Sequence, residues 1–370
     1  MASAEKRLAS EASVSLPQRV LITGAAGFVG SSIALELAKR YPDAEVVGFD
    51  NLRRRGSELN LPRLAEAGVE FVHGDVRHLS DLEQVGELGA LVECSAEPSA
   101  LAGISGDEDY ALHSNLLGAY HCLQLARARG AQVVFISTSR VYPYDRLNGL
   151  HFHENETRWE LAEDQPERGA SAAGVAEEFP LEGPRTLYGA TKLAAELLVA
   201  EYAAAFGLRT VVNRCGVIAG PWQMGKVDQG VFTYWMLGHY FRRELKYIGF
   251  GGSGKQVRDL VHIDDVVELV IDQLNRPEEW AGATVNVGGG AEFSLSLVET
   301  TELCRELTGN RLPIPATAET RPGDVCVYLS DCSRLYGRSS WRPRNDPAKV
   351  LEDIFHWISE NERAVESALR

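Results

Sequence analysis

A tyrosine and a lysine four positions apart point to proton-transfer chemistry. Tyr188 and Lys192 fall at the start of a predicted helix, where this spacing puts both side chains on one face. A free phenol has a pKa of about 10, so it is a poor base at neutral pH unless a nearby cation favours its ionised form. We therefore interpret Tyr188 as an acid/base group that is tuned by Lys192. Thr138, at the carboxyl end of a predicted strand, could hold the substrate oxygen while Tyr188 takes its proton.

A glycine-rich turn precedes these residues in the chain. Gly24, Gly27 and Gly30 lie between a predicted strand and a predicted helix, where they permit a tight turn and close approach of the backbone to a diphosphate. Free N–H groups at a helix start attract phosphates. Asp50 ends the next strand, and a carboxylate there binds the adenosine ribose and repels a 2′-phosphate. This favours NAD over NADP, although the arginines at 53–55 could accommodate a 2′-phosphate.

The elements that must position these groups alternate regularly along the chain. Strands are predicted at Val20–Thr23, Glu45–Asp50, Val69–Val72, Ala90–Glu93, Gln132–Ile136 and Thr210–Val212. Helical segments separate them up to residue 215, so we predict an α/β, doubly wound parallel sheet of the Rossmann type. After Gly216 the alternation loosens, which indicates a smaller C-terminal lobe. The expected division is a disordered tail at 1–18, a cofactor-binding domain at 19–215 with 259–287, and a substrate-binding lobe at 216–258 with 288–370.

One segment interrupts the alternation. Residues 144–187 hold ten acidic residues and four arginines but no lysine, and they show no clear period. A connection of this length is unusual in a compact domain unless it is functional or disordered. We interpret it as either a disordered insertion or a lid over the site, and Phe152, Trp159 and Phe179 could anchor a lid.

Composition excludes several classes of protein. The 370 residues are 45% hydrophobic and 24% charged, as in soluble globular proteins. The formal net charge of −15 disfavours nucleic acid or an anionic membrane as the main partner, so an anionic ligand would need a local cluster of donors. No run of ~18 apolar residues suggests a membrane span. The six cysteines form no C-x-x-C pair, and His151 and His153 have no further ligands at suitable spacing, so we expect no metal and a cytoplasmic location.

Together these motifs resemble the extended short-chain dehydrogenase/reductase family, and within it the NAD-dependent nucleotide-sugar epimerases and dehydratases. The likeness extends over about residues 19–345. The segments that are most similar to the CDP-paratose (CDP-tyvelose) 2-epimerase group are Asn51–Gly56, Glu156–Trp159, Asp228–Gly230, Gly254–Asp259 and Ser294–Leu297.

The resemblance implies which residues bind each ligand. NAD contacts are implied for Gly24, Gly27, Phe28, Val29, Gly30, Asp50, Asn51, Asp75, Val76, Tyr188 and Lys192. A nucleotide-diphosphate sugar would be bound by Arg258, Arg321, Thr138 and Gln229. Two guanidiniums can offset the roughly two negative charges of a diphosphate through charge-assisted hydrogen bonds. Family members also tend to form homodimers through the helices predicted at 111–129 and 188–206.

The resemblance also implies a reaction. In an epimerase Tyr188 removes a hydroxyl proton, and a hydride passes to NAD and returns to the other face of a transient ketone. Dehydratases of the family follow the catalytic threonine with Asp-Glu, whereas Ser139 and Arg140 stand here, which disfavours elimination. We therefore expect NAD-dependent epimerisation of a nucleotide-diphosphate sugar, as in the 2-epimerases. A 4-epimerase, a net dehydrogenase or reductase, and a noncatalytic NAD-binding protein remain open.

Overall fold

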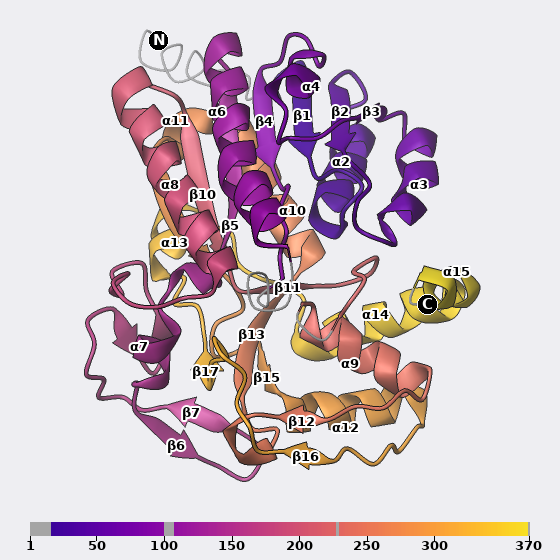
Figure 1. The fold of residues 1–370 in the computed structure, drawn as a ribbon, viewed down its shortest axis with the longest axis vertical. Coiled ribbons are helices and arrows are strands. Elements are labelled where there is room, and N and C mark those ends of the chain that lie inside the picture. The colour runs from indigo at the N-terminus through magenta and orange to yellow at the C-terminus, as the bar shows by residue number, and fades with distance from the viewer. Residues whose placement is uncertain (1–15, 100–106, 227–228, 369–370) are drawn as a thin grey trace, which may run out of the picture.

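The computed structural model describes residues 16–99, 107–226 and 229–368 (Figure 1). A seven-stranded sheet with the order β3-β2-β1-β4-β5-β10-β14 forms its centre, and all six strand pairings in it are parallel. The strands are β1 (Arg19–Thr23), β2 (Glu45–Asp50), β3 (Glu70–His73), β4 (Ala90–Glu93), β5 (Gln132–Thr138), β10 (Thr210–Cys215) and β14 (Ala283–Val287). The direction of winding reverses between β1 and β4, which opens a crevice at their carboxyl ends. The predicted doubly wound fold is confirmed.

Helices cover both faces of this sheet. One face carries α2 (Phe28–Arg40), α3 (Leu61–Glu66), α10 (Ile263–Asn275), α11 (Pro277–Trp280) and α13 (Ser333–Arg338), and the other carries α4 (Leu79–Glu83), α6 (Gly118–Arg129) and α8 (Leu187–Phe206). The short α5 (Glu108–Leu112) packs against α8. Val20 and Ile22 of β1 enter the first hydrophobic core, and Leu21 enters the second. Burial on both faces explains why the strands are continuous apolar runs.

A smaller lobe surrounds a second sheet, in which β13 is central. Its strands are β11 (Val217–Ala219), β13 (Val257–His262), β15 (Ser294–Ser296) and β17 (Val327–Tyr328), and β12 (Tyr247–Ile248) pairs separately with β16 (Ala316–Thr317). Its helices are α9 (Val231–Tyr240), α12 (Leu297–Thr308), α14 (Pro347–Glu360) and α15 (Glu362–Ala368). A third hydrophobic core forms here around Trp235, Ile354 and Trp357. The domain boundary expected at residue 259 falls inside β13.

Both ends of the described chain contribute to the core of the large sheet. Residues 1–15 of the expected tail lie outside the described residues, but Leu16 is buried in the first core and the Gln18 carbonyl accepts from the Glu45 N–H. Ordered structure therefore begins before Arg19. Near the other end, Leu335 and Trp341 enter the same core, and the Trp341 indole donates to the Asp265 carbonyl at 2.7 Å.

Residues 144–187 are an ordered part of the structure. They form α7 (Tyr144–Asn148), the hairpin of β6 (Phe152–Glu154) with β7 (Trp159–Leu161), and the short pair β8 (Ala170–Ser171) with β9 (Gly174–Val175). Phe179 is buried, and Phe152 and Trp159 pack against the same fourth hydrophobic core, which includes Val257 and Tyr328 of the smaller lobe. These apolar side chains attach the segment to that lobe, and no residue of 144–187 lines the large cavity described below.

Candidate active site

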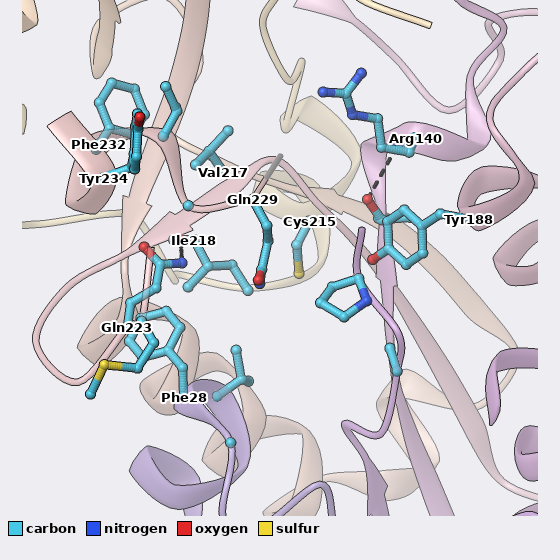
Figure 2. Close-up of a pocket in the computed structure, with 18 of the residues that line it drawn as sticks. Phe28, Arg140, Tyr188, Cys215, Val217, Ile218, Gln223, Gln229, Phe232 and Tyr234 are labelled. Carbon is cyan, nitrogen blue, oxygen red and sulfur yellow. Dashed lines mark hydrogen bonds between the residues drawn. The ribbon is translucent and has the colours of Figure 1, made fainter. Parts of the chain in front are cut away.

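A cavity of about 620 Å³ lies where the two lobes meet, at the carboxyl edge of the large sheet (Figure 2). It brings together the glycine turn, the end of β5 with Thr138, the start of α8 with Tyr188, and Arg258 and Arg321 of the smaller lobe. Gly24 and Arg321 are 297 positions apart in the sequence. The sequence nevertheless predicts a binding or catalytic role for each of these residues.

The glycine turn lies against this cavity with no room for side chains. Gly24 has a φ of +64°, and a β-carbon there would lie 2.9 Å from the Cys94 carbonyl. A β-carbon on Gly30 would lie 2.3 Å from the Gly24 carbonyl oxygen, so only glycine permits α2 to start this close to the turn. Gly27 occupies the N-cap position of α2, where no side chain accepts a hydrogen bond from the first N–H groups of the helix. Phe28 and Val29 follow it and line the cavity. The helix N–H groups at this end suit the diphosphate of a dinucleotide.

Asp50 is bound to the backbone of the glycine turn. Its carboxylate accepts from the Ala26 N–H at 3.1 Å and from the Leu52 N–H at 2.7 Å. Desolvation raises the pKa of Asp50, and these backbone hydrogen bonds counteract that rise. The carboxylate thus fixes the turn against the end of β2, although Asp50 does not itself line the cavity. Its predicted contact with a ribose stays a prediction.

Asn51 and Asp75 form a polar group close to Asp50. The Asn51 amide donates to Asp75 at 2.9 Å and to the Tyr110 hydroxyl at 3.2 Å, and Arg77 pairs with Asp75 at 2.7 Å. Burial opposes ionisation of Asp75, but the Arg77 side chain, the Arg77 N–H and the Asn51 amide together outweigh it and lower the pKa of Asp75 to about 2.

Val76 follows Asp75 but takes part in packing. Its side chain enters the second hydrophobic core, and a β-carbon on Gly118 of α6 would lie 2.6 Å from it. Neither Asn51, Asp75 nor Val76 lines the cavity, so their predicted cofactor contacts remain predictions.

Tyr188 and Thr138 meet inside the cavity. The Thr138 hydroxyl oxygen accepts from the Arg140 N–H at 3.2 Å, and Thr138 and Tyr188 both line the cavity. Figure 2 shows the Tyr188 ring at the cavity, while the Arg140 guanidinium leads away from it. Desolvation raises the pKa of Tyr188 to about 12, and the neighbouring Thr138 hydroxyl lowers it only in part. The phenol is therefore protonated at neutral pH in the protein alone.

The start of α8 is packed tightly onto the loop that follows β5. A β-carbon on Gly189 would lie 2.1 Å from the Arg140 carbonyl oxygen, so glycine is required directly after Tyr188. The Thr186 hydroxyl accepts from the Gly189 N–H and caps the helix. This close approach holds Tyr188 beside Thr138.

Lys192 lies one helical turn after Tyr188 and is buried. Its ammonium is 3.4 Å from the Glu93 carboxylate at the end of β4, and the two side chains are 1% and 2% exposed. The nitrogen also lies 3.9 Å from the centre of the Phe135 ring. Lys192 does not line the cavity. Sequence reasoning missed Glu93, because one acidic residue at the end of an apolar strand carries no pattern.

The smaller lobe supplies the predicted substrate residues. Arg258 lines the cavity, pairs with Asp324 at 3.1 Å and donates to the Val257 carbonyl; burial lowers its pKa to about 10. Arg321 lines the same cavity. Gln229 extends into it between Ile218 and Cys215 in Figure 2, and its buried amide oxygen has no hydrogen-bond partner among the described residues.

The charged lining of the cavity is mostly cationic. Among the described residues it comprises Arg54, Arg55, Arg140, Lys246, Arg258 and Arg321 against Glu244 and Asp324. A chain with a net charge of −15 therefore presents a cationic surface here, as anionic ligands require. The described residues contain no cluster of three His, Cys, Asp or Glu that could hold a metal ion. Within the same residues, no helix is both long and apolar enough to cross a membrane.

Comparison with known proteins places the chain in a family. The profile of the NAD dependent epimerase/dehydratase family matches residues 20–288, which is more than half of the sequence. The chain belongs to this family. As a member of an NAD-dependent family, this epimerase/dehydratase uses NAD as its cofactor, in agreement with the glycine cradle.

Relatives of this family member cover more than nine-tenths of its length. CDP-paratose 2-epimerase of Salmonella typhi is 28% identical and covers 92% of this chain and 99% of its own. A dTDP-glucose 4,6-dehydratase of Mycobacterium tuberculosis is 27% identical and covers 93% and 94%. The structure of UDP-glucuronic acid 4-epimerase from Bacillus cereus, in complex with UDP-glucuronic acid and NAD, has the same fold, with a TM-score of 0.75 at 21% identity and coverage of 92% and 99%.

Proposed function

We propose that this enzyme epimerises the sugar of a nucleotide-diphosphate sugar, with carbon 2 of a CDP-linked sugar as the first candidate. One observation carries the proposal: a tyrosine and a threonine line one predominantly cationic cavity built from both lobes. The similarity to CDP-paratose 2-epimerase supports the choice of carbon 2, and the match covers 99% of that relative's length.

Tyr188 and Thr138 have distinct parts in this proposal. Bound NAD would supply a hydride acceptor and donor. The Thr138 hydroxyl orients the substrate oxygen, and the Tyr188 oxygen takes the hydroxyl proton and later returns it. A pKa of about 12 is too high for this at neutral pH, so Tyr188 needs added positive charge from its surroundings.

Arg258 and Arg321 are proposed to hold the diphosphate of the substrate. Both line the cavity, and two guanidiniums match its charge. Gln229 would contact the sugar or the phosphate through its unpartnered amide oxygen. Because this oxygen is an acceptor, it needs a hydroxyl or N–H donor from the ligand.

Elimination fits this site less well than epimerisation. Ser139 and Arg140 follow Thr138 along the cavity, and neither is an acid that could protonate a departing hydroxyl. A guanidinium does not release its proton in the neutral range. Dehydratases are among the relatives. Loss of a hydroxyl group as water is helped by a positioned proton donor, which neither of these two residues supplies.

The test is a panel of CDP-, UDP- and GDP-hexoses and CDP-paratose, followed by NMR in deuterated water with NAD present. We expect inversion at carbon 2 of the CDP-linked sugar, with the original hydrogen retained at that carbon. Inversion at carbon 4 would replace the 2-epimerase with a 4-epimerase. Solvent deuterium at the inverted carbon would contradict the hydride mechanism, NADH accumulating with product would indicate a net dehydrogenase, and no product at all would contradict epimerisation.

We further propose that the enzyme is a homodimer. Four large apolar side chains are exposed among the described residues: Leu112, Leu117, Leu197 and Phe206. They lie on α5, on the π-helical turn His113–Leu117 and on α8, which pack together. A second copy covering this face would remove them from water.

A further inference from the structure

The Glu93 carboxylate is enclosed by the elements that build the active site. It ends β4, where it lies in register with Thr23 of β1 on one side and Phe135 of β5 on the other. Its side chain is 2% exposed. A buried carboxylate is costly unless a cation or hydrogen bonds compensate it. Desolvation raises the pKa of Glu93, and the charge of Lys192 opposes that rise.

Lys192 is the cation that meets Glu93. Its ammonium lies 3.4 Å from the carboxylate, and no second acidic partner is recorded for it among the residues described. The lysine is equally buried, so each charge compensates the desolvation of the other. Lys192 and Tyr188 share one face of α8, so the charge on this pair acts on the phenol.

Other titratable groups near the pair are neutral at pH 7 or lie on the far side of Tyr188. Three thiols face the pair: Cys215 on β10, Cys122 on α6 and Cys94 in the loop after β4. Burial raises the pKa of each one. Arg140, in the loop after β5, faces Tyr188 and lowers its pKa. Glu93 and Lys192 are thus the charged groups on the buried side of the phenol.

We propose that Glu93 is a positioning residue of the active site: its carboxylate holds the Lys192 ammonium one helical turn from Tyr188 and sets the charge that Tyr188 experiences. This inference rests on the proposed function. The Glu93 charge raises the pKa of Tyr188. Removing this negative charge makes the local potential more positive, which favours loss of a proton from Tyr188, so the pKa of Tyr188 should fall.

The kinetic test compares Glu93→Gln with Glu93→Asp, using CDP-paratose as substrate. We expect the limb of the kcat against pH profile that reports Tyr188 to move toward lower pH by about one unit in Glu93→Gln. Glu93→Asp keeps the charge, so its limbs should stay in place while kcat falls. Coincident profiles for wild type and Glu93→Gln, or equal shifts in the two variants, would overturn the proposal.

Glu196 provides the matched control. It lies on the same helix, is also buried, and pairs with Arg214 at 2.7 Å. Glu196→Gln should lower the melting temperature without moving either limb of the profile. A limb that moves as far as that of Glu93→Gln would show a general loss of packing and would contradict the special role of Glu93.

A stability cycle needs no substrate and so separates this inference from the proposed function. With NAD bound, Glu93→Gln should lower the melting temperature by about 5 °C or more, because it leaves a buried ammonium uncompensated. In a Lys192→Met background the same change should raise the melting temperature, since it removes an uncompensated carboxylate. An equal loss in both backgrounds would overturn the pairing, whether or not the enzyme epimerises any sugar.

Discussion

In the proposed reaction Tyr188 depends on its neighbours for reactivity, because desolvation is only partly opposed by the Thr138 hydroxyl and the Arg140 charge and leaves the pKa of Tyr188 at about 12. Lys192 follows Tyr188 by one turn of α8. The cofactor adds positive charge when its nicotinamide is oxidised. The enzyme without NAD should therefore keep a protonated phenol, and the acid/base group becomes competent only once the cofactor is bound.

Replacing the phenol tests this view directly. Tyr188→Phe should lower kcat by at least about 100-fold, because it removes the group that carries the proton. NAD binding, measured by fluorescence titration, should change little. Tyr144→Phe is the matched control, since Tyr144 lies on α7 outside the large cavity. A Tyr188→Phe enzyme with wild-type kcat would contradict the role of this residue.

Asp259 leads to a prediction of how the free energy of unfolding changes with pH. It is fully buried in β13, and burial raises its pKa to about 6 although Ser330 and Gly290 donate backbone hydrogen bonds to it. Its folded pKa thus exceeds the unfolded value of about 3.9. The stability contributed by the protonated form is present below pH 4 and is lost as the pH rises through 6.

Asp259→Asn removes that titration. Relative to wild type, the variant should gain melting temperature from about pH 4.5 to about pH 6.5 and level off by about pH 7.5, because only the wild-type side chain acquires a buried charge. Scanning calorimetry at three pH values within this range measures the difference. A constant offset between the two proteins would show that Asp259 does not titrate in this range.

At the scale of elements, the start of α8 sets the position of Tyr188, the proposed acid/base group. Gly189→Ala would place a β-carbon 2.1 Å from the Arg140 carbonyl oxygen, so the helix start must shift away from β5. We expect a loss of roughly 1–3 kcal/mol in the free energy of unfolding and a fall in kcat that exceeds any change in NAD affinity. Denaturant titration and steady-state kinetics measure both.

Gly337 supplies the comparison for this variant. It lies inside the helix α13, and nothing stands within 4 Å of a β-carbon built there. Gly337→Ala should stabilise the protein slightly through helix propensity and leave kcat unchanged. If Gly189→Ala behaved in the same way, the tight packing of α8 on the loop would have no part in placing Tyr188.

The sequence predicted the large sheet well and the smaller lobe poorly, for a physical reason. Strands buried on both faces are unbroken apolar runs, so β1, β2 and β4 were recognisable, and β5 merely extends two residues further to Thr138. The two-residue strands β12 and β16 have no period to detect, and the hairpin within 144–187 is held by contacts with distant Val257 and Tyr328.

The site residues divide in the same way, into those that belong to a local sequence motif and those that are defined by contacts between distant residues. Gly24, Tyr188 and Arg258 belong to local motifs, and the structure gathers them around one cavity. Glu93 became visible only through its contact with a lysine 99 positions away, which no local pattern encodes. Asp50 and Lys192 were predicted, yet they act on neighbours of the cavity and do not line it.

For the whole molecule, the exposed face on α5 and α8 predicts self-association. Leu197 is 67% exposed near the middle of α8, so an interface there would bury it. Leu197→Glu should convert a dimer to a monomer in light scattering, because it introduces a charge that the interface cannot solvate. Glu201→Gln, a change at an exposed position on the same helix, is the control. A wild-type protein of monomeric mass would rule out the dimer.

The return of the chain to the first core has a consequence for biosynthesis. Leu335 and Trp341 fill a core whose other members begin at Leu16, so the cofactor-binding fold lacks part of its interior until the ribosome has passed residue 341. The nascent chain must therefore carry an incomplete hydrophobic core through most of translation, with apolar surface available to chaperones. A fragment ending near residue 290 should aggregate, even though it contains every strand of the large sheet.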